Sequence, residues 1–482
     1  MAFIRDIITL FQNKRISVTI DPLLLPHIDS EDRTTLTREV SFNIYRLIYH
    51  IGTIQSRRFA TSNRLKFFDK TDLVEKIYDN TEEFRVKINE IRQVNGSETL
   101  TTISEDFGIG ISVILAENLF SIKRSTIQKI YGTGRRPDWK CQMTDNRILV
   151  TEGKGSISIQ TSNNQEADAI DQKSREPGDI KIASLTVINE DSISETRFLD
   201  PPAEGSDTSP IMENHILRAG HYASVFSFLG NSKLSMYYSQ MRKRLEGLIT
   251  PEEQGLKDEV FWDLKYNYPS IHHKNEDFVG TFYQVEDNKY IFVGVDKRLL
   301  SYRGFINYLE FEGDTDEIIN DNHFILYRDG VLLIEIINLD YFGDIVNREK
   351  ILNYQENITI SDIDEMNEIS FTKSFIYILQ KNGFVNIIEE SLTNNLQIDL
   401  KATLDNIDYY FEFKLFKSKR ISNDVFQQLR IYKNRIQEGI LVLVTNATVD
   451  SNFLDNNSFK VIDREKLEEL TRDFSLLKEL IE

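Results

Sequence analysis

Two patterns in the chain place a glutamate and a lysine two residues apart, after an aspartate thirteen or fourteen positions before the glutamate. The residues are Asp138, Glu152 and Lys154 in the first pattern and Asp399, Glu412 and Lys414 in the second. On a β-strand, residues two apart project from the same face. Each glutamate and lysine would therefore stand side by side, and the aspartate would reach them from a neighbouring antiparallel strand.

These residue types suit the hydrolysis of a phosphodiester. That reaction needs an activated water, in-line attack and an offset for the negative charge that builds on the phosphate and the leaving oxygen. Mg²⁺ (or Mn²⁺) supplies much of this and is held by hard oxygen ligands. The sequence therefore predicts metal ligands at Asp138, Glu152, Asp399 and Glu412. The two lysines would position water and neutralise charge.

The surroundings of the two triplets strengthen a spacing that is weak by itself, because 28% of the residues are charged and such triplets arise by chance. Glu152 follows the apolar run Ile148–Val150, and Glu412 lies within Tyr409–Phe413. An acid and a lysine on one face of so apolar a strand need a reason. The alternative is an edge strand with a solvated, salt-bridged face.

The elements that would position these residues predict an α/β multidomain protein with four segments. Residues 1–100 have mostly helical spacing, with a helix end at Asn95-Gly96. Residues 101–248 and 363–482 both run helix, strand with Asp, strand with Glu-x-Lys. The polar stretch 160–178 reads as a loop with a short helix. Residues 249–362 alternate apolar and polar side chains around Asp-Asn and Asp-Gly pairs, which predicts a β-rich middle domain of hairpins.

The motif Arg136-Pro137-Asp138-Trp139, followed by Glu152-Gly-Lys154, resembles the signature of the PD-(D/E)XK nuclease superfamily. The segment 363–482 is similar to its Mrr-like branch, through Gln397-Ile-Asp399-Leu, Phe411-Glu412-Phe-Lys414 and Gln428-Leu-Arg-Ile-Tyr432. Gln428 and Tyr432 also match the Gln-x-x-x-Tyr element of RecB-like nucleases. The resemblance implies two restriction-endonuclease-like α/β/α domains, a Mg²⁺-dependent endonuclease activity on DNA, with RNA left open, and a site role for Gln428.

The chain departs from the family pattern at two points. Ile398, and not proline, precedes Asp399. The acid that the family often adds from the first helix is unassigned: Glu105 or Glu117 could serve the first site, and Glu368 lies a turn away from the helix residues nearest the second.

The net charge of −19 argues at first against a nucleic-acid partner, but phosphate binding depends on local lysine and arginine. Two basic clusters flank the candidate sites. Their members are Lys123, Arg124, Lys129, Arg135, Arg136 and Lys140 in the first, and Lys414, Lys417, Lys419, Arg420, Arg430, Lys433 and Arg435 in the second. The alternative is a pair of ordinary solvated faces.

The single cysteine, Cys141, excludes an intrachain disulfide and favours a reducing compartment. With no signal peptide and no apolar run near the ~20 residues that span a bilayer, a cytoplasmic protein without a membrane partner is expected. Bacterial restriction or antiviral defence is the setting that the family suggests. A non-cleaving binding protein, a sensor–effector, one active site beside one recognition site, and a homodimer or higher oligomer all stay open.

Overall fold

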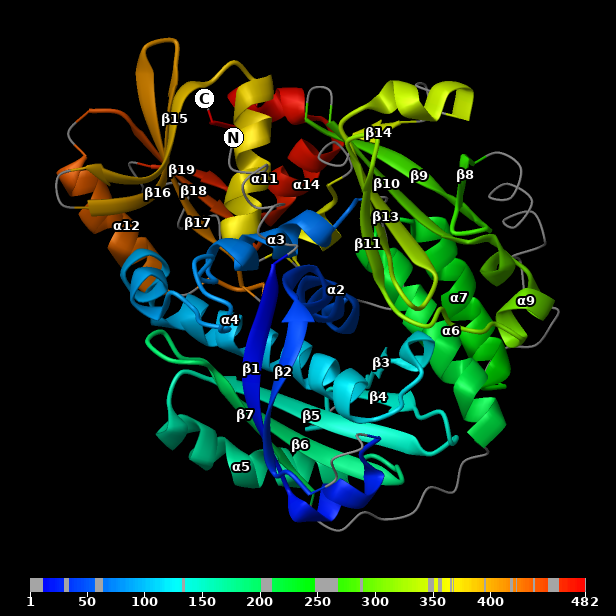
Figure 1. Cartoon of the computed structure of the whole chain (residues 1–482). Helices are drawn as coiled ribbons and strands as arrows, with labels where there is room; N and C mark the ends of the chain where they lie inside the picture. The colour runs from blue at the N-terminus through cyan, green and yellow to red at the C-terminus, as the bar shows by residue number, and fades with distance from the viewer. Residues whose placement is uncertain are drawn as a thin grey trace. The chain divides into compact units, whose positions relative to one another are not determined.

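The structure, a computed structural model, divides the chain into two compact units, Met1–Asn353 and Tyr354–Glu482. Figure 1 shows the helices and strands of both, coloured along the chain. The described residues are 12–29, 34–56, 64–131, 135–200, 210–247, 268–286, 289–345, 351–353, 358–364, 366, 368–393, 396–416, 419–421, 423–436, 438–449 and 459–481.

The first unit contains a mixed seven-stranded sheet, the first sheet, with strand order β2-β1-β7-β6-β5-β4-β3. The pairs β5–β6 and β1–β7 are parallel, and the other neighbours are antiparallel. Its strands are β1 Asn13–Ile20, β2 Thr37–Asn43, β3 Gln128–Lys129, β4 Trp139–Gln142, β5 Ile148–Ser156, β6 Ile180–Val187 and β7 Glu195–Leu199.

Strands β1 and β2 lie within residues 1–100, which the sequence predicts as mainly helical and which also contain the helices Ile44–Gln55 and Phe67–Glu75. In β1, Ile16, Val18 and Ile20 are buried while their neighbours are more exposed, which is the alternation of a half-buried strand. Strand β2 occupies residues that the sequence assigned to a helix, because its short alternation runs directly into the helical spacing that begins at Ile44. Residues 1–100 therefore supply two strands to the sheet that holds Glu152.

Helices cover the two faces of this sheet. They are α2 Ile44–Gln55, α3 Phe67–Glu75, α4 Ile88–Leu119 and α5 Ile159–Ser174. Helix α4 lies so close to β5 that a Cβ on Gly155 would overlap the carbonyl oxygen of Ser104. On the other face, Ala169 of α5 packs with Ala183 and Leu185 of β6. The polar stretch read as a loop with a short helix is thus one sixteen-residue helix, α5.

Helix α4 corrects two further expectations. It continues through residues 95 and 96, where the sequence predicted a helix end. Its portion Thr99–Leu119 is long and apolar enough to cross a membrane, although the sequence analysis counted no such run, and 72% of the most apolar window is buried inside the protein. Packing against α2 and β5 accounts for this apolar character.

The second sheet of the first unit confirms the β-rich middle region. Its strand order is β11-β12-β13-β10-β9-β14, and β8 also pairs with β9. The strands are β8 Ser270–His273, β9 Glu276–Glu286, β10 Lys289–Asp296, β11 Thr315–Ile319, β12 Asn322–Leu326, β13 Val331–Ile336 and β14 Leu352–Asn353. Shorter elements are η1 Pro22–His27, η2 Arg124–Thr126, η4 Lys297–Leu300, α9 Tyr302–Ile306 and η5 Leu339–Ile345.

The two sheets of the first unit share helices and a buried polar network. Helices α6 Pro210–Phe228 and α7 Ser232–Leu245 precede residue 248 in the chain, yet they form one hydrophobic core with β9 and β10. The fully buried carboxylate of Asp329 accepts hydrogen bonds from Tyr49 Oη and pairs with His221 Nε2, each at 2.7 Å. The structure accordingly has no division at residue 248.

The second unit is a three-layer α/β/α arrangement around a five-stranded sheet with the order β15-β16-β17-β18-β19. Strands β15 to β17 are antiparallel neighbours, and β17 to β19 are parallel. Its elements are α10 Ile360–Ile363, α11 Glu368–Lys381, β15 Val385–Thr393, β16 Leu396–Leu404, β17 Ile407–Lys414, α12 Asn423–Arg435, β18 Ile440–Thr445, β19 Lys460–Ile462, α14 Arg464–Arg472, η7 Phe474–Leu476 and α15 Leu477–Ile481.

Opposite faces of this sheet pack against different helices. Phe371 and Phe375 of α11 contact Phe411 and Phe413 of β17, in a core that α14 and α15 complete. Helix α12 packs on the other face through a second hydrophobic cluster. Helix α11 ends as its Asn-Gly pair predicts, with Gly383 at a φ of +79° that favours glycine.

One succession of elements occurs in both units. A helix is followed by three antiparallel strands, a crossover helix and a fourth strand parallel to the third. The succession is α4-β3-β4-β5-α5-β6 in the first unit and α11-β15-β16-β17-α12-β18 in the second. In each, the third strand carries the Glu-x-Lys triplet.

Candidate paired-carboxylate sites

Both candidate trios lie on adjacent antiparallel strands. Asp138 directly precedes β4 and Asp399 lies in β16, next to the strands β5 and β17 that carry the triplets. In both sheets the residue after the aspartate pairs with the residue before the glutamate; the pairs are Trp139 with Thr151 and Leu400 with Phe411. One step further along each pairing, the aspartate faces the glutamate.

The two aspartates make the same backbone contact. Asp138 Oδ2 accepts a hydrogen bond of 2.8 Å from the N–H of Gly153, the middle residue of the first triplet. Asp399 Oδ2 accepts one of 2.7 Å from the N–H of Phe413, the middle residue of the second. Since the N–H belongs to the backbone, the contact fixes each aspartate beside its triplet whatever side chain the middle residue has.

The second site gathers all four residues predicted for it. The Glu412 side chain is buried, and its Oε1 lies 3.0 Å from Lys414 Nζ. Gln428 on α12 directs its Nε2 to Glu412 Oε1 at 3.4 Å and to the Tyr432 hydroxyl at 2.7 Å. The Gln-x-x-x-Tyr spacing therefore places both side chains on the helix face above the glutamate.

The first site has an equivalent amide that the sequence analysis missed. Glu152 is buried and forms an ion pair with Lys154, whose Nζ donates a hydrogen bond of 3.2 Å to Gln172 Oε1. Gln172 lies on α5, the crossover helix after the third strand, as Gln428 lies on α12. No motif marks it, because α5 is a polar helix that the sequence analysis read largely as a loop.

The paired carboxylates hold protons more tightly than usual. Burial raises the pKa of Glu152 to about 8, and the neighbouring charge of Asp138 adds to the effect. Burial and the charge of Asp399 raise the pKa of Glu412 to about 7. Burial also raises the pKa of both aspartates above the usual range. Two acids held together, the glutamate of each pair buried, favour a proton or another cation between them.

The structure separates the two helix acids considered for the first site. Burial acts to lower the pKa of Lys154, but the acids around it, Glu105 among them, outweigh this effect and raise it. Glu117 instead pairs with Arg124 and lies 3.0 Å from His50 Nε2. Glu117 is therefore engaged elsewhere, and of the two helix acids only Glu105 contributes to the raised pKa of Lys154.

At the second site the helix acid is Glu368, the first residue of α11. Its Oε1 accepts a hydrogen bond of 3.2 Å from the N–H of Leu415, directly after the triplet. Burial acts to lower the pKa of Lys414, but the charges of Glu412 and Glu368 outweigh it and raise that pKa. An exposed acid thus stands beside the buried pair.

The donor set fits a divalent cation in part. Apart from the ion pair with Lys154, both buried carboxylate oxygens of Glu152 lack a hydrogen-bond partner, and so does Glu412 Oε2. Such buried, unpartnered oxygens are the hard ligands that Mg²⁺ prefers. Within the described part of the chain, no three His, Cys, Asp or Glu side chains are grouped closely enough to hold a metal. Each site therefore offers two carboxylates, with the helix acid further away.

Both basic clusters contain cations that pair with acids and arginines that face solvent. In the first, four of the six cations pair with acids of the same unit: Arg124 with Glu117 and Asp314, Arg135 with Asp168, and Arg136 and Lys140 with Glu176. On α12, Arg430 and Arg435 are exposed, and Lys417 falls outside the described residues. Arg135 and Arg136 beside the first site are exposed as well, so each site has two arginines that face solvent.

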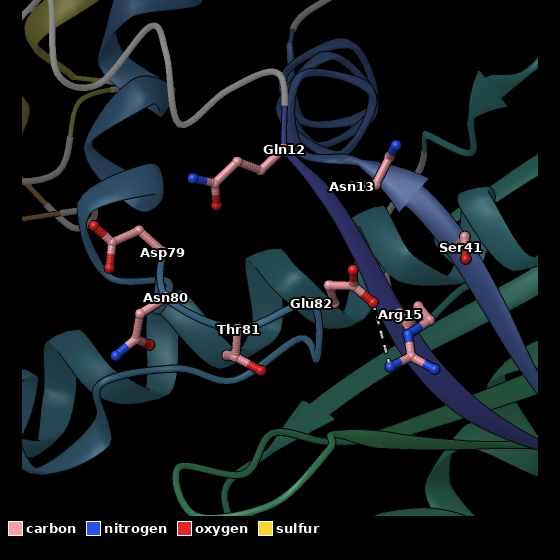
Figure 2. A pocket seen from close by; sticks show the side chains of 8 residues that line it. All are labelled: Gln12, Asn13, Arg15, Ser41, Asp79, Asn80, Thr81 and Glu82. Carbon is pink, nitrogen blue, oxygen red and sulfur yellow. Dashed lines mark ion pairs between the residues drawn. The ribbon is translucent and has the colours of Figure 1, made fainter.

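A pocket of about 530 Å³ lies elsewhere, between β1, β2 and the segment after α3. Figure 2 shows its polar lining, in which Arg15 pairs with Glu82 at 3.5 Å and Asp79 lies across from Gln12. None of the residues predicted for either site lines it.

Comparisons of the chain with protein-family models, with curated proteins and with solved structures returned no match. The two paired-carboxylate sites are thus defined by this chain's own residues and geometry.

Proposed function

We propose that the chain is a metal-dependent nuclease that hydrolyses phosphodiester bonds in DNA. One observation carries the proposal. The same trio of aspartate, glutamate and lysine occurs twice, on the same pair of strands in the same succession of elements, with the aspartate bonded to the same backbone N–H. That succession, with the acids on the second and third strands, is what the resemblance to PD-(D/E)XK nucleases implies.

Each residue would have a definite task. Asp399 and Glu412 in the second site, and Asp138 and Glu152 in the first, would hold Mg²⁺ or Mn²⁺, which would supply charge neutralisation at the phosphate and a more acidic water. Lys414 or Lys154 would orient the attacking water and offset charge on the phosphate.

In the second site, Gln428 would orient the Glu412 carboxylate, which its Nε2 approaches at 3.4 Å. The acid Glu368 beside the triplet, together with the contact of Gln428 to Glu412, makes the second site the stronger candidate for cleavage.

Cleavage of supercoiled and linear DNA by the full chain with Mg²⁺ tests the proposal. We expect Glu412→Gln to lower the rate by at least ~100-fold, as loss of a metal ligand or charge stabiliser commonly does. Glu152→Gln reports the contribution of the first site, and the double variant removes both. Glu335→Gln is the matched control, because Glu335 is a strand glutamate in the second sheet whose pKa burial raises, without a paired acid. Undiminished cutting by the double variant would contradict the proposal.

A non-cleaving role for one or both sites is the second candidate, and one observation favours it. Among the described residues, neither site has a third acid grouped with its aspartate and glutamate closely enough to hold a metal. Such a site would bind nucleic acid or a partner without cutting. It predicts salt-sensitive DNA binding in EDTA and cleavage that Glu152→Gln leaves unchanged.

A further inference from the structure

A second polar cluster lies in the second unit where its parallel strands end. Strands β17, β18 and β19 are parallel neighbours, so their carboxyl ends meet at one edge of the sheet. Lys419 follows β17, Asn446 follows β18 and Arg464 follows β19. Ligands of open α/β sheets bind outside this edge. Lys414, the last residue of β17, lies at the same edge.

One carboxylate gathers this cluster. Arg464 approaches Asp364 with both ends of its guanidinium, Nη1 at 2.8 Å from Oδ1 and Nη2 at 3.0 Å from Oδ2. Lys419 Nζ pairs with the same carboxylate, and Asn446 Nδ2 donates to it at 3.0 Å. Two cations therefore share one anion, and the cluster keeps a net positive charge.

The two cations keep unused donors that face solvent. The Lys419 and Arg464 side chains are 33% and 29% exposed, whereas Asp364 beneath them is 10% exposed. A guanidinium has five N–H donors. Arg464 uses three of them within the described residues, two on Asp364 and one on the Asn446 carbonyl. Hydrogen bonds thus remain for an anion that approaches from outside.

Two hydrogen bonds fix the backbone at Phe416 and at Lys419. The Asn446 side chain accepts a hydrogen bond of 2.7 Å from the N–H of Phe416, and Lys419 O accepts one of 3.4 Å from Thr448. Lys419 itself has a φ of +56°, a left-handed conformation that favours glycine. Because hydrogen bonds fix the backbone at this position, the lysine is preorganised for an anion. Preorganisation lowers the entropy that is lost on binding.

We propose that Lys419 and Arg464 form a phosphate-binding subsite that holds a backbone phosphate of nucleic acid beside Glu412 and Lys414, with Asp364 as the residue that positions both cations. Four residues after Asp364, Glu368 contacts the backbone directly after Lys414, which ties the subsite to the paired-carboxylate site. This inference rests on the proposed function, because the phosphate belongs to the nuclease substrate.

The test measures the binding of a short duplex DNA to the full chain in EDTA. Fluorescence anisotropy gives the affinity at each concentration of a salt series. Lys419→Gly removes one cation at a backbone position that suits glycine, and Arg464→Gln removes the other. Each should weaken binding roughly threefold and lower the salt slope by about one. Arg472→Gln is the matched control, since Arg472 lies at the far end of the same helix and its side chain is 72% exposed. Its affinity should match that of the unaltered chain.

The outcomes separate this subsite from the proposed function. If DNA binds and Lys419→Gly behaves like Arg472→Gln, the subsite is overturned while the nuclease proposal stands. If no DNA binds, a parallel titration with inorganic phosphate decides. Weaker phosphate binding by Lys419→Gly supports the subsite and rejects nucleic acid as its ligand, and unchanged or absent phosphate binding overturns it. Urea denaturation of each variant shows that affinity and not folding has changed.

Discussion

At the scale of single residues, each candidate site holds a buried glutamate beside a partly exposed aspartate. The protein tolerates this by retaining protons, by a lysine two residues along the strand and by one backbone N–H for the aspartate. When no other cation is present, repulsion between the two carboxylates of each site therefore destabilises the folded protein. This repulsion depends on pH, because protonation of the glutamate removes one of the two negative charges.

The metal-free protein should lose stability as the pH rises. The pKa of Glu412 is about 7 in the folded chain, above its ordinary value of 4.5. Between these values the folded state holds a proton that the unfolded state releases, so stability falls as the pH passes from about 5 to about 8. Glu412→Gln removes this titration. In EDTA it should be as stable as the unaltered chain at pH 5 and on the order of 1–3 kcal/mol more stable at pH 8.5.

Urea denaturation at the two pH values measures this difference. Glu438→Gln is the control, because Glu438 is an exposed glutamate of the same unit. If Glu412→Gln has the same free energy of unfolding as the unaltered chain at pH 8.5, the ionised Glu412 carboxylate does not destabilise the fold.

At the scale of elements, the close approach of α4 to β5 sets the geometry of the first site. Gly108 and Gly155 let helix and strand backbones touch, and Gly153 faces Ser112 of the same helix. Gly153 and Gly155 turn toward α4, which leaves Glu152 and Lys154 on the face toward α5 and Gln172. The glycines at 153 and 155 thus make this side of β5 the contact surface for α4.

Gly155→Ala should therefore be strongly destabilising. The added Cβ would overlap the Ser104 carbonyl, and since both partners are backbone, the helix must shift, at a cost of roughly 2–4 kcal/mol. Gly313→Ala is the matched change, because nothing lies within 4 Å of a Cβ at Gly313. Its effect should stay within ~0.5 kcal/mol. Equal melting temperatures for the two variants would rule out the close helix–strand contact.

The sequence predicted those elements whose local pattern is unambiguous. Strand β17, helix α12 with Gln428, and the helix end at Gly383 are all present in the structure. The wrong predictions of secondary structure lie where two local sequence patterns overlap or where tertiary packing outweighs a local pattern. Strand β2 merges into the spacing of α2, and α4 runs through an Asn-Gly pair because tertiary packing outweighs a local stop signal. Gln172 has no motif, so only the fold brings it to Lys154.

At the scale of the molecule, the chain divides after Asn353 and not after each predicted segment. The helices α6 and α7 and the second sheet share one core, and Asp329 is bonded to groups from α2 and α6. No sequence pattern reveals that helices before residue 248 serve a sheet after it. Long-range packing of this kind is visible only in three dimensions.

Fragments of the chain test this division. Residues 354–482 contain complete hydrophobic clusters on both faces of their sheet and should fold alone, with one cooperative urea transition. Residues 1–353 should also fold. Residues 1–248 should not, because they would expose the α6 and α7 surfaces that pack on β9 and β10. A cooperative, monomeric 1–248 fragment would show that the shared core is dispensable.

The hydrogen bond from the middle residue of each triplet to its aspartate has a consequence for how freely that position can vary. Glycine in one copy and phenylalanine in the other donate the same N–H. Nineteen of the twenty amino acids carry that donor, and proline alone lacks it. The middle position of Glu-x-Lys therefore has a structural role. In a survey of every substitution at Phe413, residues that fit the core should keep the hydrogen bond to Asp399, and proline should remove it.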